Sequence, residues 1–192
     1  QVGGMIIKDG FRQAEFRPRR DLAADAFRNL ALGKLTFLTS GIMVRSSCLE
    51  SIGVFDESLR RGQDIDFLLR LFMVYKLAVI EIPLITFHQQ TDKKLGDSVE
   101  HARLRILAKH EETIRRLLGE RVARQFRSVH LLDIADAEFR SGQATKGVKY
   151  LISALSYHPV VSPGRLLRLL LSAMGLLANV KSLLRRMARP VC

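Results

Sequence analysis

Two aspartates, two residues apart, could do chemistry because of where they fall in the chain. Asp64 and Asp66 open the stretch 64–75, whose apolar residues leave only Arg70 charged in its body. This pattern predicts a helix that is buried on most of its circumference. The N–H groups and the dipole at a helix N-terminus favour an ionised carboxylate, so Asp64 could face a cleft. The alternative is that Asp64 is an N-cap and Asp66 a first-turn residue, a stabilising arrangement worth about 1 kcal/mol.

The residues around these aspartates form an ordered set of short motifs. Thr-Ser-Gly-Ile-Met-Val-Arg occupies 39–45, Ile-Gly-Val-Phe-Asp-Glu occupies 52–57 and Gln-Asp-Ile-Asp-Phe-Leu-Leu-Arg occupies 63–70. In order and spacing they resemble family 2 glycosyltransferases of the GT-A type. That family has a strand ending in a basic residue, a short helix, a glycine-containing FDE turn and an acidic helix start. The likeness covers roughly residues 36–88.

The resemblance implies an inverting transfer of a sugar from a nucleotide-sugar donor to a hydroxyl acceptor, which is a sugar or a lipid-linked sugar, in cell-surface polysaccharide synthesis. It gives Asp64 the role of the base that takes the proton from the acceptor hydroxyl as that oxygen attacks the anomeric carbon. It places Gln63, Asp66 and Arg70 in substrate binding, with Asp66 and Arg70 orienting the helix.

Three further polar residues follow from the same resemblance. Thr39 and Ser40 are expected to face the donor or acceptor pocket, with a plain loop role as the alternative. His88 is expected near the donor diphosphate as a metal ligand, with an ordinary hydrogen-bonded histidine as the alternative. The family uses a divalent cation, Mg²⁺ or Mn²⁺, but no Asp-x-Asp follows a strand in this sequence. We therefore expect that motif and the donor-binding half before Gln1, and weak or no activity from this chain alone.

The elements that would position these residues alternate between strand and helix. Strands are predicted at 2–7, 41–44, 77–82 and 84–87, and helices at 22–32, 46–52 and 64–75. Such alternation predicts an α/β fold. Residues 1–98 are accordingly interpreted as the acceptor-side part of a GT-A domain.

The pattern changes near residue 98 to long helical stretches. Helices are predicted at 99–118, 120–141, 143–157 and 165–187. The second and third would form an antiparallel pair around Ser141 and Gly142, ended by Pro159, and resemble one tetratricopeptide-type hairpin. Residues 99–192 are therefore interpreted as an all-α extension that caps the first part.

Charge is distributed unevenly along the chain. The net charge is +12, and residues 1–98 carry 14 basic and 12 acidic side chains whereas residues 99–192 carry 17 and 7. The segment 165–192 has six basic residues and no acidic one around an apolar run at 169–180, which is shorter than the roughly 20 residues of a membrane span. This pattern predicts a basic amphipathic helix on an anionic membrane surface, or one packed on the helical cap.

Other features narrow the class of protein. The basic residues of the tail alternate with leucine and not with aromatic residues that stack on bases, which argues against a nucleic-acid partner. The two cysteines, Cys48 and Cys192, provide no disulfide framework or zinc-ligand spacing, which favours a reducing compartment. The expected location is the cytoplasm, at the inner face of the membrane. The alternative to an enzyme is a helical module that binds a protein or a membrane without catalysis.

Overall fold

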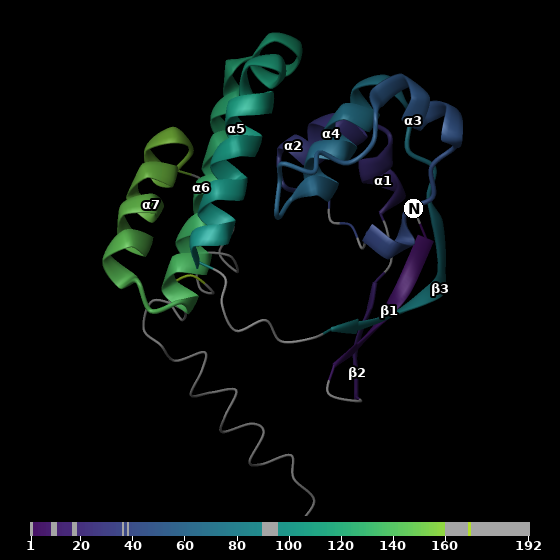
Figure 1. The fold of residues 1–192 in the computed structure, drawn as a ribbon, viewed down its shortest axis with the longest axis horizontal. Helices are drawn as coiled ribbons and strands as arrows, with labels where there is room; N and C mark the ends of the chain where they lie inside the picture. Colours follow the sequence, from purple (N-terminus) through teal and green to yellow (C-terminus); the bar gives the residue numbers. More distant parts are fainter. Residues whose placement is uncertain are drawn as a thin grey trace, which may run out of the picture.

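The computed structural model describes residues 2–8, 11–16, 19–35, 37, 39–89, 96–159 and Leu169. Helices account for most of these residues, and the strands form one small sheet beside them (Figure 1). In chain order the elements are β1 (Val2–Lys8), β2 (Phe11–Phe16), α1 (Arg20–Ala23), α2 (Ala26–Ala31), the 3₁₀ turn η1 (Thr39–Gly41), α3 (Ser46–Ile52), α4 (Gln63–Val74), β3 (Ile80–Gln89), α5 (Gly96–Leu118), α6 (Glu120–Arg140) and α7 (Ala144–Tyr157).

The predicted α/β fold, a partial GT-A domain, is wrong. The part of the chain that the structure describes is mostly helical, and its strands are confined to a sheet of order β2-β1-β3. Strand β1 is antiparallel to β2 and parallel to β3, and four helices separate β2 from β3. The regular strand-helix alternation of a layered α/β domain is therefore missing.

Local structure explains part of this error. The apolar run at 41–44, predicted as a strand, begins with the last residue of the turn η1 and forms no strand. Met43 in this run is 89% exposed, whereas Ile42 and Val44 are partly buried against the helical core, so the run packs on helices and not in a sheet. The strands predicted at 77–82 and 84–87 are instead one strand, β3, which continues through Pro83. Proline lacks the N–H of a ladder hydrogen bond and is tolerated because β3 lies at the edge of the described sheet.

Three of the four long helices predicted after residue 98 are confirmed, with shifted ends, as α5, α6 and α7. Gly119, with φ 87°, makes the tight connection between α5 and α6, which run antiparallel. Arg103 and Asp133 form an ion pair of 3.2 Å across this helix pair, and Arg127 pairs with Glu111. The fourth predicted helix, 165–187, lies outside the described residues apart from Leu169. Within the described residues, no helix has the length and apolarity needed to cross a membrane.

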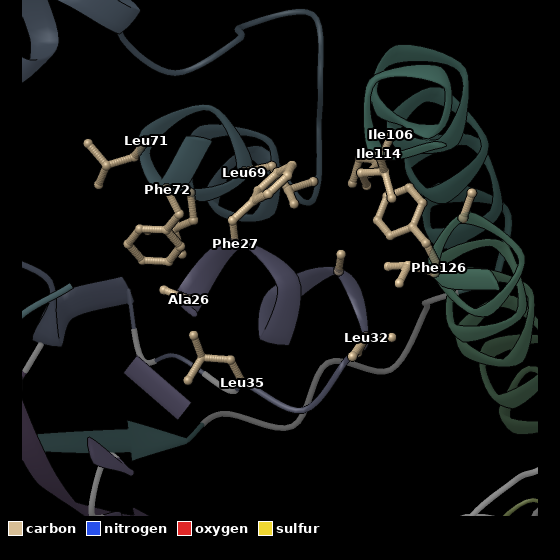
Figure 2. Close-up of a cluster of buried hydrophobic side chains, with 14 of the residues drawn as sticks. Ala26, Phe27, Leu32, Leu35, Leu69, Leu71, Phe72, Ile106, Ile114 and Phe126 are labelled. Carbon is tan, nitrogen blue, oxygen red and sulfur yellow. The ribbon is translucent and has the colours of Figure 1, made fainter. Parts of the chain in front are cut away.

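One hydrophobic core joins the two halves of the chain (Figure 2). Phe27 of α2 and Leu69 of α4 lie beside Ile106 and Ile114 of α5 and Phe126 of α6 in this cluster. Burying each such side chain contributes about 1.5–3 kcal/mol. The helices α2 and α4 thus bury their apolar faces on the α5–α6 pair, and the start of α4 is held next to the start of α5.

A second, smaller cluster lies between α6 and α7. Leu131, Ile134 and Ala135 of α6 contact Ala154 of α7 there, and Leu169 is buried in the same cluster. The chain beyond α7 therefore returns to this helix pair at least at Leu169.

Candidate functional site

A pocket of about 600 Å³ lies at the N-terminal end of α4. Its walls come from η1, from the segment leading into α4 and from the first turns of α5. The lining residues are Thr39, Phe55, Arg60, Arg61, Gly62, Gln63, Asp64, Ile65, Val99, Ala102 and Arg103. The structure therefore brings together Thr39, Gln63 and Asp64 of the predicted site.

The start of α4 is set by a glycine. Gly62 is the N-cap and has φ 75°, a left-handed conformation that side-chain-bearing residues seldom adopt. A Cβ at this position would lie 2.7 Å from Cδ1 of Ile106 in α5. The glycine thus lets the backbone turn sharply and approach α5 closely. It also means that Asp64 is not the N-cap, as the alternative interpretation had it, but the second residue of the helix.

Two hydrogen bonds fix the carboxylate of Asp64 at the pocket. Thr39 donates from Oγ1 to Asp64 Oδ2 at 3.2 Å, across 25 residues of sequence. The backbone N–H of Ile65 donates to Asp64 Oδ1 at 2.9 Å. Asp64 is half-buried. A carboxylate held by two donors and open to a pocket is a suitable proton acceptor for a bound hydroxyl.

Asp66 lies behind the pocket and is fully buried. Its Oδ2 accepts from Nε and Nη2 of Arg70 at 3.1 and 2.9 Å. Its Oδ1 lies 2.7 Å from Nζ of Lys109 and 2.7 Å from Nε2 of His110, both in α5. Asp66 therefore ties α4 to α5, and neither Asp66 nor Arg70 lines the pocket.

Arg70 extends this network to the turn before α4. Its Nη2 donates to the carbonyl of Val54 at 2.7 Å, and its Nη1 donates to the carbonyl of Ile52. Phe55 in the same turn lies against Phe67 of α4, with ring centroids 4.9 Å apart, while its other side lines the pocket. The network thus holds one wall of the pocket in place.

The charges of the network are mutually stabilised. Burial alone would raise the pKa of Asp66, but hydrogen bonds from Lys109, His110 and Arg70 outweigh burial and keep this pKa below its usual value. Burial lowers the pKa of His110, and Asp66 only partly opposes that effect. Burial would also lower the pKa of Lys109, but its bonds to Asp66 and Asp56 raise it. At neutral pH the network therefore contains an ionised Asp66, a charged Lys109 and a neutral His110.

The remaining predicted residues do not join the pocket. Ser40 is exposed in η1 and is not among the lining residues. His88 lies in β3, and its side chain is outside the described part of the structure. Asp64 is the one carboxylate among the described lining residues, which also include three arginines, so these residues do not fit a divalent cation site. No group of three or more His, Cys, Asp or Glu residues among the described residues could hold a metal ion.

Three arginines of the pocket were not predicted as site residues. Arg60 and Arg61 directly precede Gly62, and Arg103 comes from α5. The Arg60-Arg61 pair beside an acidic motif was a visible signal in the sequence. Arg103 gave none, because a single arginine in an amphipathic helix is ordinary and only the packing of α5 on α4 brings it to the pocket.

Comparison with known proteins found no matching family model, curated protein or solved structure.

Proposed function

We propose that this chain takes part in the transfer of a sugar from a nucleotide-sugar donor to a hydroxyl acceptor, with Asp64 as the base. The observation that carries the proposal is the placement of the Asp64 carboxylate in a pocket, bound by Thr39 and by a backbone N–H. The motifs at 39–45, 52–57 and 63–70, which resemble family 2 glycosyltransferases, support it. The proposal does not depend on a GT-A fold.

In the proposed reaction, an acceptor hydroxyl approaches the free side of the Asp64 carboxylate. Its proton passes to a carboxylate oxygen as its oxygen forms a bond to the anomeric carbon of the donor. The bond from that carbon to the donor diphosphate breaks, the nucleoside diphosphate leaves with the electron pair, and the configuration at the carbon is inverted. The donor cation that this chemistry often uses has no fitting ligand set among the pocket residues, so no step is assigned to it.

The network of the buried Asp66 and the partly buried Arg70 has a positioning role in this proposal. Asp66 is two residues from Asp64 in the same helix, and Arg70 binds the carbonyl groups of Ile52 and Val54 in the turn that carries Phe55. A network that fixes both α4 and this turn holds the base at a constant position relative to the pocket wall. Such fixed positioning of a catalytic group beside its substrate raises the reaction rate.

The test is an assay of nucleoside diphosphate release from a panel of nucleotide-sugars with sugar and lipid-linked acceptors. Replacing Asp64 by asparagine, Asp64→Asn, should lower the rate by roughly 10²–10⁴-fold while leaving the fold intact, because Asn cannot accept the proton. Glu50→Gln, an exposed change in α3 that removes the same charge, is the matched control. An Asp64→Asn protein as active as the Glu50→Gln control would refute the proposal.

A helical interaction module is the second candidate function. Val148 and Ile152 lie four residues apart on α7 and are 45% and 63% exposed, so α7 carries an uncovered apolar stripe. The basic segment at 165–187 would add attraction to an anionic membrane surface on the cytoplasmic side. Flotation with anionic vesicles tests this candidate, since deletion of residues 170–192 should abolish vesicle binding.

A further inference from the structure

The first described turn of α5 forms one wall of the pocket at the start of α4. Val99, Ala102 and Arg103 line the pocket, and their spacing of three and four residues places them on one face of the helix. Ile106 continues this face and is fully buried in the core shared with α4. The shared core therefore fixes α5 from Ile106 onward, whereas the turn that lines the pocket lies before that point.

Two side chains of α7 bind this turn at Glu100, the residue after Val99. Glu100 is partly buried, and its Oε1 accepts a hydrogen bond from the hydroxyl of Tyr150. Its Oε2 accepts from Nζ of Lys146, which also forms an ion pair with it. Lys146 and Tyr150 are four residues apart and so share one face of α7. The start of α5 is thus tied directly to α7, although α6 comes between them in the chain.

A buried carboxylate of α6 supports this contact. Glu138 is fully buried, and Lys146 Nζ lies 3.2 Å from its Oε1 as a counter-charge. Neither carboxylate oxygen of Glu138 has a hydrogen-bond partner within the described part of the chain. Leaving a buried charge unpaired is strongly unfavourable, so Glu138 keeps Lys146 at this place. Lys146 therefore joins a carboxylate of α5 to one of α6.

The hydrogen bond from Tyr150 is maintained over a wide pH range. Burial and the bond to Glu100 raise the pKa of Tyr150 to about 12, so its hydroxyl remains a donor at neutral pH. Hydrogen bonds to a charged acceptor are stronger than those between neutral groups. A second tie holds the same turn from α6, because Arg103 Nη2 lies 3.2 Å from Asp133 Oδ2. The pocket wall is thus held from both α6 and α7.

We propose that α7 positions the α5 wall of the pocket, with Tyr150 and Lys146 acting through Glu100 as positioning residues. The helical extension is then a working part of the site and not only a cap on the first half of the chain. The proposal rests on the proposed function for the view that this pocket holds substrate. It adds the part of the chain that keeps the pocket in shape.

The experiment measures hydrogen–deuterium exchange of the full chain at pH 7 without substrate, resolved by mass spectrometry. Tyr150→Phe should speed the exchange of amides 100–104 roughly tenfold, since a hydrogen bond to a charged acceptor contributes about that factor. Amides 108–114 of α5 should exchange as in the wild type. Tyr157→Phe is the matched control, because it removes the same hydroxyl at the far end of α7, where the ring lies over Arg127. Lys146 is left unchanged because its loss would strand the charge of Glu138.

Glu100→Gln gives a second measurement. Glutamine keeps an acceptor for Tyr150 but loses the attraction to Lys146, so the same amides should exchange faster than in the wild type. In the sugar-transfer assay, Tyr150→Phe should raise KM more than it lowers kcat. Asp64 keeps its own hydrogen bonds to Thr39 and Ile65, so the base itself is not displaced.

Three results overturn the proposal. One is exchange of amides 100–104 that is as slow in Tyr150→Phe as in Tyr157→Phe. Another is an equal rise throughout α5, α6 and α7, which would mean a general loss of stability. The third is a faster exchange of the wall with no change in KM. Failure of the glycosyl-transfer proposal looks different, because the local rise in exchange would persist while Asp64→Asn left every measured rate unchanged.

Discussion

Replacing Asp66 by asparagine should destabilise the fold far more than its small change in shape suggests. Asp66 Oδ1 faces Lys109 and His110 and its Oδ2 faces Arg70, so both oxygens accept from cationic or N–H donors. An asparagine amide must turn its NH₂ group toward one of these donors, whichever way it is oriented. The substitution therefore places a donor against a donor and leaves the partly buried Arg70 without its counter-charge.

The size of the effect follows from the surroundings. Removing one partner of a buried ion pair costs about 3–5 kcal/mol. Lys109 keeps its 2.9 Å pair with Asp56, and Arg70 keeps the carbonyl of Val54, so the lower end of that range is expected, about 3 kcal/mol. For a chain of this length that corresponds to a fall in Tm of roughly 6–12 °C.

The assay is thermal and urea unfolding of the full chain at pH 7, followed by circular dichroism. Glu50→Gln is again the charge-matched control and should change stability by less than about 0.5 kcal/mol, because Glu50 is exposed in α3. In acid the two proteins should converge. The pKa of Asp66 is lowered in the folded state, so its contribution is present above the usual value of 3.8 and is lost as the pH falls below it. A loss under about 1 kcal/mol at pH 7, or no convergence in acid, would refute the reasoning.

Two further predictions concern the junction of α4 and α5. Gly62→Ala should lower the free energy of unfolding by about 1–2 kcal/mol because of the left-handed backbone, and by more because the new Cβ would lie 2.7 Å from Ile106. The control is Gly142→Ala, at φ 85° with nothing within 4 Å of the new Cβ. Equal losses of free energy for the two variants in urea unfolding would exclude an effect of the contact with Ile106. The pKa of His110 is lowered by burial, so the unfolded chain takes up a proton first and stability should fall as the pH drops below 6.5. His110→Gln should flatten stability profiles between pH 6.5 and 5, and an unchanged slope there would contradict a buried neutral histidine.

The sequence was most informative where one helix carries its own pattern. The apolar run at 64–75 is α4 (Gln63–Val74), and the three long patterns after residue 98 are α5, α6 and α7. Their periodicity and length specify helix without help from distant residues. Short apolar runs do not specify a strand by themselves. The run at 41–44 forms none, and its Ile42 and Val44 pack against the helical core instead.

The class of fold and half of the site depend on contacts between distant residues. The partners of Asp66 include Lys109 and His110, more than 40 residues away, and these are unremarkable in an amphipathic helix. The pocket needs Arg103 from the same helix. Asp64 could be predicted because several motif residues lie near it in the sequence. The α5 residues beside it could not, because only the packing of α4 on α5 brings them there.

The hydrophobic core shared by α4 and α5 also determines how fast the amide hydrogens exchange with solvent and what a protease can release. Leu69 of α4 and Ile106 of α5 are both fully inaccessible to solvent in that core, so neither helix can open without exposing the other. The amides at the centres of α4 and α5 should therefore exchange with deuterium at one common, slow rate set by global unfolding. A protease cut near residue 98 would not release two independent domains. Asp64 lies in the same helix as Leu69, five residues before it, so its position should be lost only when the whole fold unfolds.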